Sequence, residues 1–135
     1  MPVPPLNHVL CIDDDADMRL VAELALEKVG GIQATTCASG EEALALLEKE
    51  GVDPDLILLD VVMPGMDGPA TLGALQQHSP TADTPVIFLT ARVEPRHTEL
   101  LLDLGVLGII KKPFDPLTLA DEVLGYWERY HYCEK

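Results

Sequence analysis

The chain has 135 residues, which is enough for one ordinary domain. Hydrophobic residues make up 47% of it, so the composition excludes a disordered chain. Acidic residues outnumber basic ones by 23 to 9, which gives a formal net charge of -14. Because nucleic acids and anionic membranes bind basic faces, we expect no direct nucleic-acid binding and no membrane docking. The natural complement is a cation or a basic protein surface.

The cysteines bear on disulfides and zinc binding, and the apolar runs bear on the cellular location of the protein. The three cysteines are widely spaced with no CxxC pair, so we predict neither a disulfide framework nor a zinc site. The first residues lack the basic and apolar pattern of a signal peptide. The longest apolar run, 100–110, contains Asp103 and is too short to span a bilayer. We therefore expect a cytoplasmic protein.

Short apolar runs alternate with longer amphipathic stretches. The runs are continuous and rich in β-branched residues, which is typical of buried parallel strands. They are Val9–Ile12, Ile32–Cys37, Leu56–Leu59, Val86–Leu89 and Val106–Ile110.

Two of the amphipathic stretches show a helical stripe of apolar residues. The stripes are Met18, Val21, Ala22, Ala25 and Val29, and later Leu117, Ala120, Leu124 and Trp127. Asp15 and Ser39 are expected to cap the first two helices, and Asp115, followed by a proline, the last. Gly51 is expected at a helix end.

Five alternating β and α segments predict an α/β fold in which helices cover both faces of a parallel sheet. No internal repeat, low-complexity segment or linker interrupts the pattern. We expect one domain over residues 7–131, preceded by an N-terminal tail (1–6) and followed by a C-terminal tail (132–135).

Polar residues follow four of the predicted strands, at the sheet edge where ligands bind in open α/β folds. Asp13 and Asp14 follow the first strand and Asp60 the third, while Thr90 and Lys112 follow the fourth and fifth. Clustered carboxylates repel one another unless a cation lies among them. Hard oxygen ligands that leave room for water and phosphate suit Mg²⁺. We therefore expect a magnesium site at Asp13, Asp14 and Asp60.

Such a site can carry phosphoryl chemistry. A carboxylate such as Asp60 can attack phosphorus and form an aspartyl phosphate. A metal neutralises charge on the transferring oxygens, and catalysis is then mostly positioning and electrostatics. Lys112 would supply a second positive charge and Thr90 a hydrogen bond.

Four segments together resemble the receiver domain of bacterial response regulators, over roughly residues 6–130. They are Ile12–Asp15, Leu59–Gly68, Leu89–Ala91 and Lys112–Phe114. The resemblance implies a flavodoxin-like three-layer sandwich, with a five-stranded parallel sheet of order 2-1-3-4-5 and five helices. It also implies a signalling domain of a two-component phosphorelay rather than an enzyme. Such a domain accepts a phosphoryl group from a histidine kinase or histidine phosphotransfer protein and then switches its interaction surface.

The resemblance assigns the phosphoacceptor and metal roles residue by residue. Asp60 would be the phosphoacceptor. Asp14 and Asp60 would bind Mg²⁺ directly, together with the backbone carbonyl of Val62, while Asp13 contributes mainly through water.

The resemblance also assigns the groups that face the phosphoryl group. Lys112 would pair with it, next to a cis bond to Pro113, and Thr90 would be the switch hydroxyl. Lys111 has the weaker claim, because successive side chains of a strand point to opposite faces.

Three residues bear on how such a domain would signal. Ile109 stands where the family has a Tyr or Phe that turns inward with the switch hydroxyl, so an aromatic rotamer cannot report phosphorylation and the output mechanism is open. Val62 and Arg92 should flank the path of the hydrolytic water. Val62 cannot orient a water and Arg92 could shield the phosphate, so we expect slow self-dephosphorylation.

Other function classes share some of these sequence features with a receiver domain. A receiver-like module that binds partners irrespective of phosphorylation stays open because of Ile109. A haloacid-dehalogenase-like phosphatase also uses a strand-end Asp and an aspartyl phosphate, but it needs a second Asp where Val62 stands. An EF-hand is excluded, because Met18 and Leu24 stand where the loop needs Gly and Glu. The aromatic residues near the end predict the buried side of the last helix or a partner patch, and a homodimer stays open.

Overall fold

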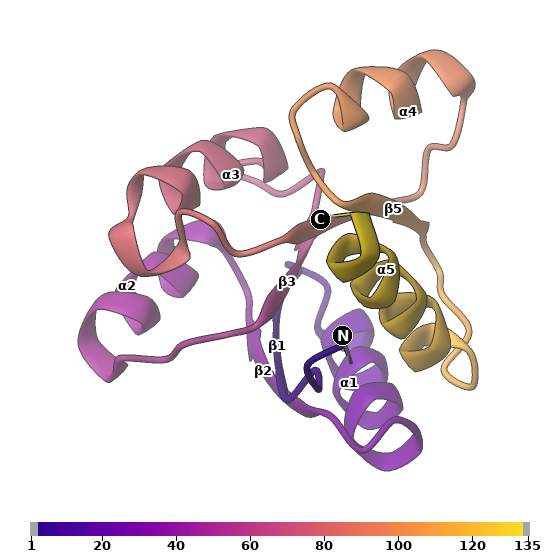
Figure 1. Ribbon diagram of the computed structural model, residues 1–135. Coiled ribbons are helices and arrows are strands. Elements are labelled where there is room, and N and C mark those ends of the chain that lie inside the picture. Colours follow the sequence, from indigo (N-terminus) through magenta and orange to yellow (C-terminus); the bar gives the residue numbers. More distant parts are fainter. Residues whose placement is uncertain (1–2, 134–135) are drawn as a thin grey trace.

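Five strands and five α-helices alternate along residues 3–133, the part of the chain that the computed structural model describes (Figure 1). The strands are β1 (His8–Ile12), β2 (Gln33–Cys37), β3 (Leu56–Asp60), β4 (Val86–Thr90) and β5 (Gly108–Lys111). The helices are α1 (Ala16–Leu24), α2 (Gly40–Glu50), α3 (Gly68–Gln77), α4 (Pro95–Leu102) and α5 (Leu119–Cys133). A π-helical turn, η1 (Ala25–Val29), continues α1, and a 3-10 turn, η2 (Ser79–Thr81), follows α3.

The sheet has the order β2-β1-β3-β4-β5, and all its paired strands are parallel. This confirms the flavodoxin-like arrangement implied by the resemblance. The chain leaves β1 toward β2 on one side and returns to β3 on the other, which opens a crevice at the carboxyl ends of β1 and β3. Ile12 pairs with Leu59 there. The residues that follow them, Asp13 and Asp60, therefore lie beside each other.

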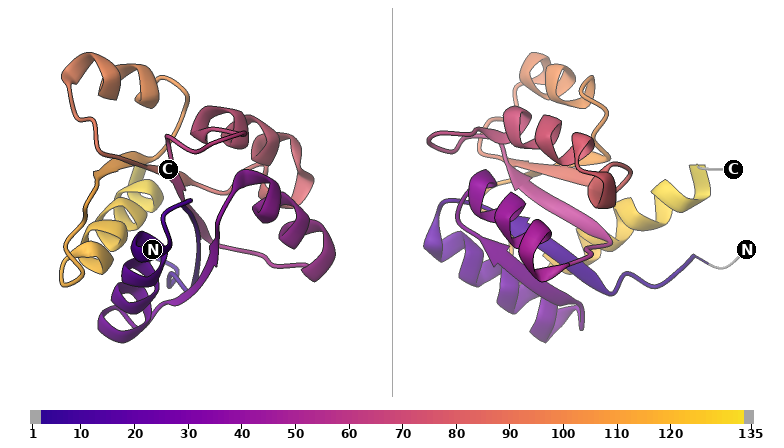
Figure 2. Two further views of the ribbon diagram at one scale, coloured as in Figure 1. Left: turned by 180° about the vertical axis from the view of Figure 1, so that it is seen from behind. Right: turned by 90° about the vertical axis from the view of Figure 1, so that its left-hand side faces the viewer.

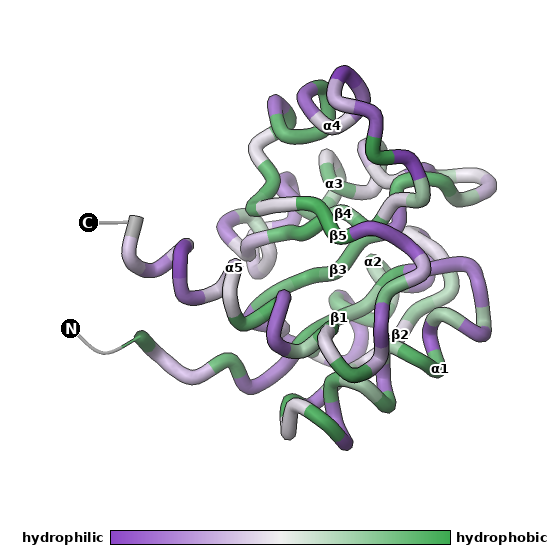
Figure 3. Tube along the Cα trace, turned by 90° about the vertical axis from the view of Figure 1, so that its right-hand side faces the viewer, coloured by the Kyte–Doolittle hydropathy of each residue, from purple (hydrophilic) through white to green (hydrophobic). Residues whose placement is uncertain are grey.

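Helices cover both faces of the sheet (Figure 2), and one apolar layer on each face holds them against it. On β1, Val9 and Cys11 face the layer formed with α1 and α5, whereas Leu10 and Ile12 face the layer formed with α2, α3 and α4. The hydrophobic strands run through the middle of the molecule in Figure 3. Fully burying such a side chain stabilises the fold by about 1.5–3 kcal/mol. These two layers therefore keep the strand ends in place.

Cys11 and Cys37 are free, buried core residues, as expected. Burial raises the pKa of the Cys11 thiol to about 12 and that of Cys37 to about 11. Both thiols therefore stay protonated at neutral pH, and neither forms a disulfide within the described residues.

Three of the predicted caps are confirmed. The Asp15 carboxylate accepts hydrogen bonds from the backbone N–H groups of Asp17 and Met18 at the start of α1. Ser39 Oγ accepts one from Glu42 at the start of α2. Gly51 ends α2 in the left-handed region at φ 63°. The Asp15 and Ser39 caps each satisfy helix-end N–H groups that would otherwise lack a partner.

The predicted apolar stripe of the first helix is wrong at Val29, which is 52% exposed. The cause is η1, in which the Gly30 N–H bonds to the carbonyl of Ala25, five residues back. A π-helical turn is wider than an α-helical one, so the period of 3.6 residues no longer applies across it. Val29 is thereby rotated away from the core.

The starts of two late elements also differ from the prediction. Strand β5 begins at Gly108 rather than at Val106. Helix α5 begins at Leu119, after a turn in which the Asp115 carboxylate accepts a hydrogen bond from the N–H of Leu117. Asp115 therefore caps this leading turn, and Leu117 is 71% exposed instead of facing the core.

The N-terminal segment packs along α5. Leu6 is buried, Val3 packs against the core, and Trp127 Nε1 donates a hydrogen bond of 2.8 Å to the carbonyl of Pro4. Both ends of the described chain lie on one side of the molecule (Figure 2). Of the predicted tails, residues 1–2 and 134–135 lie outside the described part. Within residues 3–133, no helix has the length and apolar character needed to cross a bilayer.

Strand β2 forms one edge of the sheet. The Glu27 carboxylate, from η1, accepts a hydrogen bond of 3.1 Å from the N–H of Ala34. The N–H of Gln33 donates to the carbonyl of Asn7, just before β1, and the carbonyl of Cys37 accepts from the N–H of Asp13, just after it. Bonded residues alternate along a strand, so the N–H of Ala34 points to the open edge. Glu27 thus satisfies a backbone donor that the sheet leaves unpaired.

Two glycines of α3 give a matched test of how tightly this helix approaches β3. A Cβ on Gly68 would lie 2.7 Å from the carbonyl oxygen of Asp60 and from the Cα of Val61, whereas one on Gly73 would meet nothing within 4 Å. We predict that Gly68→Ala lowers the free energy of unfolding by roughly 2–3 kcal/mol, because the backbones must separate. Gly73→Ala should raise it by about 0.5–1 kcal/mol through helix propensity. Urea unfolding checks this, and equal effects of the two substitutions would contradict the close approach.

Candidate metal and phosphoryl site

The residues that follow β1, β3, β4 and β5 meet around one cavity of about 230 Å³. Its lining residues are Asp14, Asp15, Asp60, Val62, Thr90, Ala91, Arg92 and Lys112. Asp13 lies beside them and is fully buried. The structure therefore brings together every candidate site residue at the sheet edge where the strand order reverses.

Three carboxylates form an acidic cluster in this site. One oxygen each of Asp13, Asp14 and Asp60 lies within 4.8 Å of the others. Asp13 and Asp60 are buried, with 0% and 4% of their surface exposed, while Asp14 is open to solvent. Two buried like charges beside a third, all oxygen donors and with open space next to them, fit a hard divalent cation such as Mg²⁺.

The Lys112 ammonium group lies between the two buried acids. Its Nζ is 2.9 Å from Asp13 Oδ2 and 3.2 Å from Asp60 Oδ2. Apart from this contact with Lys112, Asp13 Oδ2 has no hydrogen-bond partner among the described residues. One ammonium therefore does not satisfy both carboxylates, which leaves an acceptor for a further cation.

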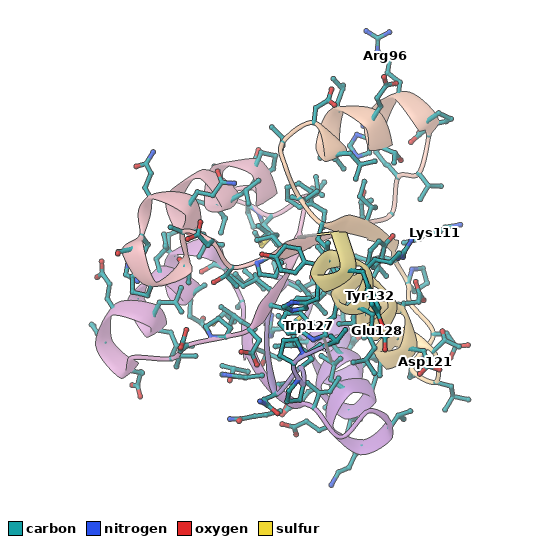
Figure 4. All side chains as sticks on the ribbon, in the orientation of Figure 1. Arg96, Lys111, Asp121, Trp127, Glu128 and Tyr132 are labelled. Atoms are coloured by element: carbon teal, nitrogen blue, oxygen red, sulfur yellow. The ribbon has the colours of Figure 1, made fainter. Side chains whose placement is uncertain are left out.

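The predicted choice between the two adjacent lysines agrees with the structure. The bond between Lys112 and Pro113 is cis, as expected. Lys111 is exposed and points outward from β5 (Figure 4). Only Lys112 of this pair reaches the acids.

The Asp60 carboxyl group has a perturbed protonation equilibrium. Burial, and next the Asp13 carboxylate, raise the pKa of Asp60 to about 7, although the Lys112 charge lowers it. Burial alone would lower the pKa of Lys112, but its hydrogen bond and charge contacts with Asp13 and Asp60 raise it above the ordinary value. Lys112 is therefore charged at neutral pH, and Asp60 is the group whose charge the site leaves least stabilised.

Local hydrogen bonds order the loops after β3 and β4. The N–H of Arg92 donates to Thr90 Oγ1 at 3.1 Å, and the N–H of Val62 lies 3.4 Å from Asp60 Oδ1. Thr90 is buried, whereas the Val62 side chain is 71% exposed at the cavity rim. The Arg92 guanidinium pairs at 3.5 Å with the exposed Glu94. Val62 and Arg92 thus border the cavity from two sides.

Ile109 lies on β5 opposite Phe88 and is partly buried against the layer that contains Phe88. An aromatic ring from α5 also lies against this part of β5. Tyr126 packs over Gly108, whose Cβ would lie 2.2 Å from the ring, and its hydroxyl donates to the carbonyl of Ile109 at 3.1 Å. The aromatic group here is thus bonded to the main chain of β5 rather than carried by it.

One residue close to the site was not among the predicted candidates. Arg19, on α1, donates a hydrogen bond of 2.8 Å from Nη1 to the carbonyl oxygen of Asp13. The only signal in the sequence is a basic residue one turn into the helix that follows an acidic strand end. That signal does not distinguish a contact with the loop from a solvated charge.

Comparison with known proteins agrees with this geometry. The family model of the response regulator receiver domain matches residues 9–124. The transcriptional regulatory protein CpxR of Escherichia coli is 37% identical over 130 residues, which cover 96% of this chain and 53% of that protein. The response regulator SaeR of Staphylococcus aureus is 32% identical over 130 residues, covering 94% of this chain and 54% of that protein.

A solved structure extends the comparison to three dimensions. The chemotaxis protein CheY4 of Vibrio cholerae superposes with a TM-score of 0.80 at 31% identity, covering 90% of this chain and 99% of that one. The chain therefore belongs to the receiver domains of response regulators, the signalling domains of two-component systems. It spans about half the length of the curated relatives it matches. The wider domain limits, residues 7–131, stay a prediction.

Because the pKa of Asp60 is raised, we predict that a neutral residue at this position stabilises the metal-free protein relative to wild type, and that this stabilisation grows as pH rises. In the unfolded chain this carboxyl titrates at about 3.9, so from there to about 7 the folded state binds more protons and wild-type stability falls as pH rises. Asp60→Asn avoids this loss but also loses the ion pair with Lys112. Urea unfolding in EDTA should show the variant gaining roughly 2 kcal/mol over wild type between pH 4.5 and pH 8. A constant difference across this range would contradict the raised pKa.

Proposed function

We propose that this domain accepts a phosphoryl group on Asp60 from a phosphohistidine of a histidine kinase or histidine phosphotransfer protein. The observation that carries the proposal is the position of Asp60, almost buried yet lining the cavity, with Asp13, Asp14 and Lys112 around it. A nucleophile at a cavity wall, next to a fixed cation and a set of metal-binding oxygens, has the parts that phosphoryl transfer needs.

Asp60, Lys112 and Thr90 each have a different role in the phosphoryl transfer. A carboxylate oxygen of Asp60 forms the new bond to phosphorus while the bond from phosphorus to the donor imidazole nitrogen breaks, and that nitrogen regains its lone pair. Lys112, now 3.2 Å from Asp60, then pairs with the phosphoryl oxygens. The Thr90 hydroxyl donates a hydrogen bond to them from the end of β4.

The acidic cluster would hold the metal. Asp13, Asp14, Asp60 and the backbone carbonyl of Val62 would bind Mg²⁺, with Asp13 acting mainly through water, and the bound ion neutralises charge on the transferring oxygens. The two buried carboxylates of Asp13 and Asp60 share one ammonium group, and the remaining negative charge supports this assignment.

Phosphorylation would then change the interaction surface of the domain. Because Ile109 carries no aromatic ring, we propose that any change travels through Thr90 and the main chain of β5 rather than through a ring flip. The downstream partner would be another protein. A homodimer of this domain stays open as well. The cytoplasmic location expected from the sequence stays a prediction.

The phosphoacceptor is tested by incubation with Mg²⁺ and acetyl phosphate, followed by intact mass measurement. We predict a gain of one phosphoryl group that is lost in Asp60→Asn, because the amide is no nucleophile. Asp55→Asn is the matched control, since Asp55 stands at the other end of β3 and caps the N–H groups of Asn7 and His8. An unmodified wild type would refute the assignment, and catalytic turnover of phosphate esters would favour a phosphatase.

The lifetime of the phosphate is a separate prediction. We expect slow self-dephosphorylation, because the exposed side chain of Val62 offers no hydrogen bond to an attacking water. Val62→Asn supplies an amide at this place and should speed phosphate loss several-fold, because the amide can hold an attacking water by a hydrogen bond. The decay of phosphoprotein after removal of acetyl phosphate measures it, with Val62→Leu as the control. A decay no faster in Val62→Asn counts against this role.

A further inference from the structure

Arg19 contacts the main chain of the acidic loop rather than any carboxylate oxygen. Its Nη1 donates a hydrogen bond of 2.8 Å to the carbonyl oxygen of Asp13, and its side chain is half-buried on α1. Asp13 is fully buried, so its carbonyl oxygen has no direct contact with bulk solvent that would replace a lost partner. Buried carbonyl groups need a partner.

The other polar groups of Asp13 are held by different elements. Its N–H donates to the carbonyl of Cys37 at 3.0 Å, its Oδ1 accepts from the N–H of Asp15 at 3.0 Å, and its Oδ2 lies 2.9 Å from Lys112 Nζ. Arg19 supplies the bond to the remaining group, the carbonyl oxygen.

That carbonyl belongs to the peptide unit between Asp13 and Asp14. A peptide unit is planar, so the direction of its carbonyl also sets the direction of the following N–H and Cα. The Asp14 carboxylate projects from this Cα. The bond from Arg19 therefore restricts where the Asp14 carboxylate lies relative to Asp13 and Asp60.

We propose that Arg19 is a positioning residue for magnesium binding, which holds the peptide between Asp13 and Asp14 so that the three carboxylates stay within reach of one cation. This inference rests on the magnesium site of the proposed function. Groups that orient metal ligands commonly change metal affinity by tenfold or more when they are removed.

Electrostatics alone predicts the opposite result. Arg19 carries a positive charge one turn from the acidic cluster, and a positive charge repels a metal cation. If charge were its only effect, removing Arg19 would tighten magnesium binding. If Arg19 positions the loop, removing it weakens binding, so the sign of the change separates the two.

The experiment is a calorimetric titration of purified protein with MgCl₂. We expect Arg19→Met to weaken binding about tenfold, and Arg19→Lys, which keeps one N–H donor, to recover most of the affinity. Lys28→Met is the control, because it removes one positive charge from an exposed position in η1. Unchanged or tighter binding by Arg19→Met, or a Lys variant as weak as the Met variant, overturns the proposal.

A second measurement needs no metal. In EDTA, amide hydrogen exchange of the loop 13–15 should be faster in Arg19→Met than in wild type or Lys28→Met, while the exchange of β3 stays unchanged. Faster exchange throughout the chain would mean general destabilisation and would overturn the positioning role. If wild-type protein binds no magnesium but the loop loosens as expected, the magnesium site fails while the hold of Arg19 on the loop stands.

Discussion

The mutual repulsion of two buried carboxylates is the constraint on which the rest of this structure depends. Asp13 and Asp60 lie side by side because β1 and β3 are neighbours, and the surrounding apolar layers exclude the water that would screen them. Lys112 offsets part of that repulsion from β5. The negative charge that Lys112 leaves unbalanced is the property that suits the site to the cation and the phosphoryl group of the proposed function. The fold therefore holds the site in a state that a ligand relieves.

The loops of the site are held by the sheet itself. Backbone pairing continues one residue past three strands, through the N–H groups of Asp13, Val61 and Lys112, at 3.0, 3.0 and 2.8 Å from their acceptors. Loops tied in this way have little freedom to move the residues that follow them. The acids and the ammonium group are thus placed before any ligand arrives, which is the arrangement that electrostatic catalysis requires.

Much of this could be predicted from the sequence, because strand runs and strand-end polar residues are local patterns. The alternation along β5 even separates Lys112 from Lys111. The errors have physical causes that single residues do not display. Val29 is exposed because a π-helical turn interrupts the period of 3.6 residues, and no single residue predicts such a turn. The contact of Arg19 with the Asp13 carbonyl was missed, since a main-chain acceptor leaves no mark in the sequence.

The bond between Glu27 and the open side of β2 has a consequence for how copies of this molecule can associate. A strand from another chain that joined the sheet at Ala34 would have to displace the carboxylate and bury or expel its negative charge. Lengthening the sheet into a ribbon shared by two molecules is therefore disfavoured on this side. On this side of the sheet, other proteins would meet helical and loop surfaces, where no backbone donor has to change its partner.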